Sequence, residues 1–247
     1  MVKLDAMENP YSLPQALAEA WRGELSNVDI NRYPDPSSQA LKDRMYEVLG
    51  LPDRAALILG NGSDEIIQML AMALGGEGRA FMSMDPAFVM YRMIALMNGM
   101  RYVSADLQSD SFSIDMASTL ATIEAEQPAV LFVANPNNPT GNSHSLDDLR
   151  RLAEAVPGVL VIDEAYAPFT DTTALPLLEE YSHVLVMRTF SKMGLAGLRL
   201  GYLLGDAQWI RELDKVRLPY NINVLTQRAA AFALTHYATF EQQTMQI

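Results

Sequence analysis

Short apolar runs alternate with longer amphipathic stretches along this chain. The runs are rich in valine, leucine and isoleucine and show no strict alternation, which is typical of strands buried on both faces of a sheet. We predict strands over residues 79–84, 101–107, 129–135, 158–164, 183–190 and 198–205.

Between these runs, apolar residues recur at three- and four-residue spacing, which predicts helices over residues 86–99, 115–127, 145–156 and 206–217. Ser145 followed by Asp148 resembles a capping box at the start of the third helix. Buried strands separated by helices indicate an α/β fold, a doubly wound and mostly parallel sheet sandwiched by helices. In such folds ligands bind outside the carboxyl ends of the strands.

The composition narrows the range of functions. The chain has 247 residues and a formal net charge of −12, which disfavours a nucleic-acid partner. It has no cysteine and its three histidines stand apart, so we expect no disulfide framework and no metal site. No apolar run approaches the roughly 18 residues of a membrane span, and the amino terminus lacks a secretory signal. We therefore expect a cytoplasmic protein that acts on small molecules.

The stretch LGNGSDEII places Gly60, Asn61, Gly62, Ser63 and Asp64 immediately before a long helical pattern. Glycines permit a close backbone approach, and a helix start offers unpaired amide N–H groups. The stretch can therefore cradle a phosphate. A capped helix after a turn is the plainer alternative.

Two further polar stretches follow buried strands. ANPNNPTG (134–141) is dense in amide side chains, although turn formation alone accounts for its residue types. In VIDEAYAPF, Asp163 stands where a buried strand emerges, and a carboxylate there is costly unless it meets a positive partner or hydrogen-bond donors. Tyr166, three residues later, can reach a ligand that binds at Asp163. The alternatives are a helix cap for Asp163 and core packing for Tyr166.

The stretch RTFSKMGLAGLRLGY (188–202) holds Lys192 and Arg199 in an apolar neighbourhood. Desolvation there lowers the pKa of Lys192, as an imine-forming lysine requires, because the neutral amine is the nucleophile. A solvent-facing side chain is the alternative, and the commoner fate of lysine. For Arg199, a buried anion explains the position better than a surface ion pair.

Together these groups describe one ligand. A phosphate suits the glycine stretch with Ser191 and Arg199, a ring cation suits Asp163, and an aldehyde suits Lys192. A ring hydroxyl suits the amide and the tyrosine that follow two strands, Asn138 and Tyr166. These features belong to pyridoxal 5′-phosphate, whose usual protein partners include a Schiff-base lysine and an acid facing the pyridine nitrogen.

At this point the sequence resembles the fold-type I pyridoxal-phosphate aminotransferases, and more narrowly the histidinol-phosphate aminotransferase family. The likeness rests on KLDAMENPY, NRYPDPSSQAL, GNGSDEII, NPNNPTG, DEAYAPF, RTFSKMGLAGLRLGYL and VRLPYNIN, which follow one another in the family's order. They extend from Lys3 to about Asn223 and therefore cover nearly the whole chain.

The resemblance implies a role for each matched residue. Lys192 would bind the cofactor aldehyde, Asp163 would keep the pyridine nitrogen protonated, and Tyr166 with Asn138 would hydrogen-bond the ring oxygen. Phosphate contacts would come from the amides of Gly62, Ser63 and Asp64, the hydroxyl of Ser191 and the guanidinium of Arg199.

Two aromatic positions carry further implications. Phe88 matches the residue that stacks on the cofactor ring, although it is often tyrosine in relatives. Tyr33 matches a tyrosine that reaches the phosphate in the neighbouring subunit of a homodimer. The implied reaction is amino transfer between L-histidinol phosphate and 2-oxoglutarate in histidine biosynthesis. An aromatic aminotransferase, a threonine-phosphate decarboxylase and a catalytically incomplete cofactor-binding fragment are the alternatives.

The chain also departs from the family pattern. Met7 stands where the family usually has asparagine, so a polar contact near the substrate is expected to be lost. We expect residues 1–32 to form an amino-terminal segment and residues 33–247 a cofactor-binding large domain. That domain would end in a helix leading to a smaller domain beyond Ile247, which in the family supplies the arginine that binds the substrate carboxylate.

Overall fold

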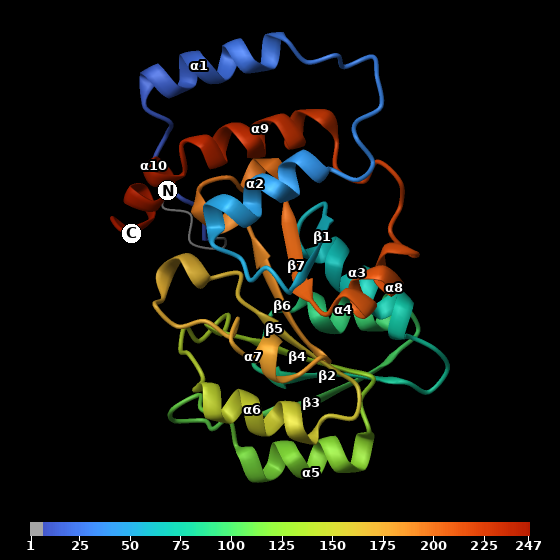
Figure 1. Ribbon diagram of the computed structural model, residues 1–247. Helices are drawn as coiled ribbons and strands as arrows, with labels where there is room; N and C mark the ends of the chain where they lie inside the picture. Colours follow the sequence, from blue (N-terminus) through green and yellow to red (C-terminus); the bar gives the residue numbers. More distant parts are fainter. Residues whose placement is uncertain (1–6) are drawn as a thin grey trace.

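A sheet of seven strands runs through the middle of the computed structural model, with helices on both of its faces (Figure 1). The structure describes residues 7–247. The first residues of the KLDAMENPY motif and of the expected amino-terminal segment lie outside that range.

The strands are β1 (Ala56–Gly60), β2 (Ala80–Asp85), β3 (Arg101–Asp106), β4 (Val130–Ala134), β5 (Val159–Asp163), β6 (Val184–Thr189) and β7 (Gly201–Gly205). Their order across the sheet is β1-β7-β6-β5-β4-β2-β3, which makes β5 the central strand. The pairs from β3 to β6 are parallel, and β7 runs antiparallel to both β6 and β1. The expected mostly parallel α/β sheet is therefore confirmed.

Strand β1 is the strand that the sequence pattern did not predict. Its apolar residues ALILG run directly into the glycine stretch. Among residues 7–247 the strand pairs only with β7, where Gly60 lies opposite Gly201. Leu57 and Leu59 pack on one face of the sheet and Ile58 on the other, so β1 is buried on both faces like the strands that were predicted.

The helices are α1 (Gln15–Ser26), α2 (Gln39–Leu49), α3 (Ser63–Leu74), α4 (Met90–Met97), α5 (Met116–Glu126), α6 (Leu146–Ala155), α7 (Leu177–Glu180), α8 (Ala207–Asp214), α9 (Val224–Thr235) and α10 (Tyr237–Thr244). Three short 3₁₀ turns are η1 (Ala167–Phe169), η2 (Ser191–Met193) and η3 (Ala196–Leu198). All four predicted helices are present. Ser145 caps α6 as expected, because its Oγ accepts from the amide of Asp148 at 3.1 Å.

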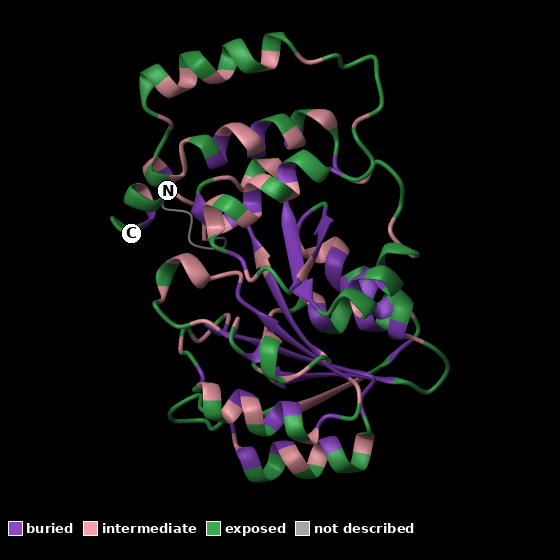
Figure 2. Cartoon of the chain, viewed as in Figure 1, coloured by how far each residue is buried: buried purple, intermediate pink, exposed green. Residues whose placement is uncertain are grey.

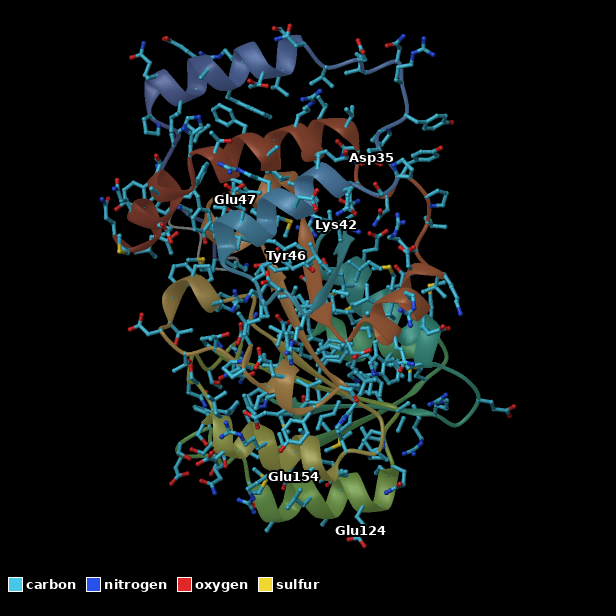
Figure 3. The ribbon with its side chains drawn as sticks, in the orientation of Figure 1. Asp35, Lys42, Tyr46, Glu47, Glu124 and Glu154 are labelled. Atoms are coloured by element: carbon cyan, nitrogen blue, oxygen red, sulfur yellow. The ribbon has the colours of Figure 1, made fainter. Side chains whose placement is uncertain are left out.

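The helices bury the sheet from both sides (Figure 2). Helices α3, α4 and α8 share one apolar cluster with the sheet, whereas α5, α6 and α7 share a second on the opposite face. Helices α2 and α9 cover β1 and β7. Helix α1 lies outermost, on α9, and buries none of its residues fully. Acidic side chains such as Glu124 on α5 point into solvent, in keeping with the negative net charge (Figure 3).

The reversed direction of β7 brings distant stretches to one edge of the sheet. β5 ends at Asp163 and β6 at Thr189, so residues after them emerge at the carboxyl edge. Gly201, the first residue of β7, lies opposite both Thr189 and Gly60. Residues just before β7 therefore meet the residues that follow β1 and β6. Among the described residues, no helix is long and apolar enough to cross a membrane.

Candidate active site

A cavity of about 240 Å³ opens at this carboxyl edge. It is lined by side chains from strand ends and helix starts along most of the chain. They include nine of the residues predicted from the sequence: Ser63, Asp64, Phe88, Asn138, Asp163, Tyr166, Ser191, Lys192 and Arg199. Functional side chains from separate stretches of the sequence therefore line one cavity.

Asp163 ends the central strand and is only 6% exposed. Its Oδ2 accepts a hydrogen bond from Tyr91 Oη at 2.6 Å, and its Oδ1 accepts one from the Ala165 amide at 2.9 Å. Desolvation raises the pKa of Asp163 to about 6, although these two bonds oppose the rise. Within residues 7–247 it forms no ion pair, although Lys192 in the same cavity lies close enough to sense its charge.

Lys192 follows β6 in turn η2 and is half-buried. Desolvation lowers its pKa, as predicted, while the charges of Glu8 and Asp163 oppose that effect. Its Nζ donates to the backbone carbonyl of Met7 at 3.3 Å and lies 5.2 Å from the ring centre of Tyr166. Because Met7 uses its carbonyl here, the side-chain replacement at that position leaves this contact intact.

The start of α3 and Arg199 form the other end of the cavity. Gly62 has φ = +84°, and a side chain there would collide with the Arg199 guanidinium, whose Nη2 would lie 2.5 Å from the added Cβ. A Cβ on Gly201 would lie 2.7 Å from the Ser63 amide nitrogen. These two glycines let the guanidinium and the helix start approach each other closely.

At this end of the cavity the structure modifies two expectations, the burial of Arg199 and the availability of the Gly62 amide. Arg199 is not buried: its side chain is 49% exposed and pairs with Asp64 at 3.2 Å, the surface ion pair that had been the alternative. It directly follows η3, shortly before β7 begins at Gly201. The Gly62 amide already donates to the Gly60 carbonyl at 2.8 Å. The Ser63 and Asp64 amides lie in the first turn of α3, where intrahelical acceptors are lacking.

Ser191 and Thr189 form a buried hydroxyl pair behind Lys192. The Thr189 Oγ1 lies 2.9 Å from the Ser191 Oγ and 3.1 Å from the Leu200 carbonyl. The Ser191 amide also donates to Thr189 Oγ1 at 3.2 Å. The Ser191 hydroxyl is thereby held in place at the cavity wall.

The asparagine-rich stretch has two kinds of residue. Asn135 and Asn137 are buried and hold the loop: Asn135 Oδ1 accepts from the His144 amide at 2.8 Å, and Asn137 Nδ2 donates to the Pro86 carbonyl at 3.0 Å. Asn138 is half-buried and lines the cavity. The density of amides thus reflects both loop geometry and the site.

Two predicted site residues do not line this cavity: Gly62, which lies against Arg199 at its edge, and Tyr33, which stands away from it. Tyr33 is 81% exposed and stacks on Tyr220 with ring centres 4.6 Å apart. Its expected role belongs to the site of a neighbouring subunit, so it stays a prediction.

Tyr91 and Thr189 are site residues that sequence reasoning missed. Tyr91 stands three residues after Phe88, the spacing of neighbours on one helix face, and this was the signal that could have found it. Thr189 precedes Ser191 by two residues, but nothing local marks its hydroxyl as a partner of Ser191.

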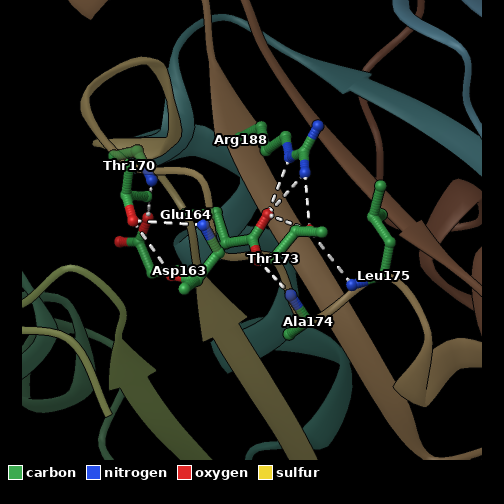
Figure 4. Close-up of polar contacts among 9 residues, drawn as sticks. Asp163, Glu164, Thr170, Thr173, Ala174, Leu175 and Arg188 are labelled. Carbon is green, nitrogen blue, oxygen red and sulfur yellow. Dashed lines mark hydrogen bonds and ion pairs between the residues drawn. The ribbon is translucent and has the colours of Figure 1, made fainter. Parts of the chain in front are cut away.

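Glu164, next to Asp163, faces a different set of partners (Figure 4). It is 1% exposed, and its Oε2 accepts from Arg188 Nε at 2.8 Å, from Arg188 Nη2 at 2.7 Å and from Thr173 Oγ1 at 3.1 Å. Its Oε1 accepts from the Ala174 amide. This carboxylate is fully paired within the fold.

Comparison with known proteins identifies the family. Residues 1–247 match the family model "Aminotransferase class I and II". The chain is 52% identical to histidinol-phosphate aminotransferase 2 of Nitrosococcus oceani over 98% of its own length and 67% of that protein. It is 47% identical to histidinol-phosphate aminotransferase of Chromobacterium violaceum, covering 69% of that protein. The chain thus spans about two thirds of the length of these relatives.

The fold agrees with this match. Histidinol-phosphate aminotransferase from Sinorhizobium meliloti, solved in complex with pyridoxal-5′-phosphate, superposes with a TM-score of 0.86 at 26% identity, over 97% of this chain and 66% of that one. The enzyme from Clostridium acetobutylicum gives a TM-score of 0.84 at 22% identity, over 97% of this chain and 71% of that one. The chain belongs to the class I and II aminotransferases and, within them, to the histidinol-phosphate aminotransferase family.

Proposed function

We propose that this protein carries out pyridoxal-phosphate-dependent amino transfer between L-histidinol phosphate and 2-oxoglutarate, a step of histidine biosynthesis. One observation carries the proposal: a buried acid that forms no ion pair within residues 7–247, a lysine whose pKa is lowered by desolvation, and an arginine beside a helix start line the same cavity. The relatives at 46–52% identity bear the name of this enzyme.

The residues of the cavity suit the chemical groups of the cofactor. Asp163 suits a protonated ring nitrogen, because a cation opposite this carboxylate would offset its desolvation. The helix start at Ser63 and the Arg199 guanidinium suit a phosphate. Phe88 offers an aromatic face, and Tyr166 with Asn138 offers donors for a ring oxygen. When bound, the cofactor supplies an aldehyde that condenses with amines and a ring that accepts electron density.

Lys192 has two tasks in this proposal. Its amine holds the cofactor between turnovers, which requires a neutral nitrogen, and the lowered pKa increases the neutral fraction. With substrate in the cavity, Lys192 Nζ would take the proton from the substrate carbon that carries the nitrogen. Asp163 stays ionised opposite the ring nitrogen during that transfer.

We also propose that the protein acts as a homodimer in which Tyr33 reaches the neighbouring subunit's cavity. The exposure of Tyr33 supports this role, and so do the apolar side chains of Ile30 and Leu218, which are 78% and 70% exposed. Large exposed apolar side chains are expected where another chain packs. Sedimentation velocity of the wild type and of Tyr33→Ala tests the assembly and the contribution of this residue.

A titration of the purified protein with pyridoxal phosphate, followed by a single half-reaction, tests the function. We expect visible absorbance that depends on Lys192 and is bleached by L-histidinol phosphate faster than by phenylalanine or threonine phosphate. Lys215→Ala is the matched control, because Lys215 follows α8 and does not line the cavity. Full absorbance and turnover in Lys192→Ala would refute the proposal.

A further inference from the structure

Tyr91 is a buried tyrosine in direct contact with the acid of the cavity. Its side chain is fully buried in the first turn of α4, and its hydroxyl donates to Asp163 Oδ2 at 2.6 Å. The two residues are 72 positions apart in the sequence. A short bond to a carboxylate is a charge-assisted hydrogen bond, the stronger kind in proteins.

The contact fixes one of the two carboxylate oxygens. Oδ1 is held by the Ala165 amide at 2.9 Å, and Oδ2 is held by Tyr91. The carboxylate is therefore anchored at both oxygens, which defines its orientation at the cavity wall. The Ala165 bond comes from the backbone and does not depend on a side chain, so Tyr91 is the anchor that a point substitution can remove.

Packing alone does not explain a tyrosine at this position. The ring of Tyr91 lies 4.9 Å from that of Phe132 and meets Phe88 edge-on at 5.6 Å. A phenylalanine would make the same ring contacts. The hydroxyl is the part that phenylalanine lacks, and its partner is the acid that we expect to face the cofactor ring.

We infer that Tyr91 is a positioning residue: its hydroxyl orients the Asp163 carboxylate toward the ring nitrogen of the cofactor and stabilises its charged form. This inference rests on the proposed function. Two neighbouring residues at the start of α4 would then act on the same cofactor ring. Phe88 would stack on its face, and Tyr91 would act on its nitrogen through Asp163.

Other charges around Asp163 bear on its titration. Asp64 from α3 and the adjacent Glu164 raise the pKa of Asp163, but less than desolvation does. Lys192 lies close enough for the charge of Asp163 to raise the lysine pKa, and Tyr166 senses the same carboxylate. Tyr91 acts in the opposite sense to the acids, because its hydrogen bond lowers the pKa of Asp163.

The first measurement uses Tyr91→Phe without cofactor. The Asp163 carboxyl is followed by carbon-13 NMR of aspartate-labelled protein and identified by its loss in Asp163→Asn. We expect Tyr91→Phe to raise the pKa of Asp163 by about one unit. Tyr102→Phe is the matched control, because this tyrosine also donates to an aspartate, Asp85 at 3.3 Å, and should leave the Asp163 titration unchanged.

The second measurement is the affinity for pyridoxal phosphate. We expect Tyr91→Phe to weaken binding about tenfold. In the Asp163→Asn background the same substitution should have no effect, whereas a packing role would give equal losses in both backgrounds. The double variant lacks the buried charge and should fold even if Tyr91→Phe does not.

Two results would overturn the inference: an unchanged Asp163 titration in Tyr91→Phe, or equal losses of affinity in both backgrounds. A wild-type protein that does not bind pyridoxal phosphate would instead refute the proposed function, because the NMR titration of the cofactor-free protein does not depend on cofactor binding.

Discussion

Asp163 and Glu164 are consecutive carboxylates at the end of the same central strand, yet the fold treats them in opposite ways. Both are at least nine-tenths buried. Glu164 turns toward Arg188, Thr173 and the backbone beyond η1, where a cation and several donors satisfy it. Asp163 turns to the other side, where its carboxylate has two hydrogen-bond partners within residues 7–247, the Tyr91 hydroxyl and the Ala165 amide.

The difference separates a structural charge from a functional one. A buried ion pair with complete hydrogen bonding has no capacity left for a ligand, and removing one partner leaves the other unpaired. A buried acid without a cation is unfavourable in the free protein and becomes favourable when a cation arrives. Only Asp163 therefore has the electrostatics of a binding residue, although the sequence places both acids at the same strand end.

The largest expected effect separates the two acids by chemistry. Asp163→Asn should slow the half-reaction with L-histidinol phosphate at least about a thousandfold, because the ring nitrogen loses its counter-charge. Glu164→Gln should change the rate per folded molecule by less than about tenfold, because Glu164 does not line the cavity. Stopped-flow absorbance measures both rates. Similar losses in the two variants would contradict the division of roles.

For the free energy of unfolding we expect the reverse order: Glu164→Gln should destabilise the protein more than Asp163→Asn. Glu164→Gln leaves Arg188, whose side chain is 16% exposed, without its carboxylate, and should lower the free energy of unfolding by about 3 to 4 kcal/mol. Denaturant unfolding of the cofactor-free protein measures this loss. A second variant, Glu164→Gln with Arg188→Met, should recover part of it. If Asp163→Asn were the more damaging single variant, the comparison would fail.

The pH dependence of stability should come from Asp163. Its folded pKa of about 6 lies above the value of 3.8 expected in the unfolded chain, so the unfolded state releases its proton first as the pH rises. The cofactor-free wild type should therefore lose about 3 kcal/mol relative to Asp163→Asn between about pH 4 and pH 6. Unfolding curves recorded across that window measure the difference, and parallel pH profiles would disprove its origin.

The smallest expected effect concerns the end of the cavity formed by the start of α3 and Arg199, where we expect the cofactor phosphate to bind. Gly62→Ala places a methyl group against the Arg199 guanidinium and should weaken pyridoxal-phosphate binding about tenfold. Gly50→Ala is a control for an added methyl group at positive φ, +58°, because no atom lies within 4 Å of the new Cβ, although Gly50 is in the left-handed region and Gly62, with ψ of 168°, is not. Fluorescence titrations compare the two. Equal affinities would mean that the close approach of Arg199 is not needed.

The local features of the site follow from the sequence. Apolar runs define strands by their own residue types, and a polar residue after such a run must stand at a strand end, as Asp163 and Lys192 do. The helix start at Ser63 is equally local, because Gly62 and the amphipathic pattern after it lie within a few positions. For these reasons eight of the nine predicted cavity residues could be named from the chain's own pattern before the fold was known, and Phe88 followed from the family resemblance.

The partners of those residues depended on the tertiary structure. β7 runs against its neighbours, and that reversal decides that Arg199 meets Asp64 and Gly62. Strand β1 carries a local apolar run, ALILG, like the predicted strands, whereas its antiparallel pairing with β7 was decided by the tertiary structure. The contact between Tyr91 and Asp163 spans 72 positions and has no local signature beyond a helical spacing.

The sequence by itself thus determined which chemical groups this protein carries to the edge of its sheet. Only the tertiary structure decided which charges are paired, since Asp163 and Glu164 are adjacent acids with the same local surroundings. The physical reason is range: backbone preference is set by neighbours a few residues away, whereas desolvation and charge pairing are set by whichever distant segments the fold packs against a side chain.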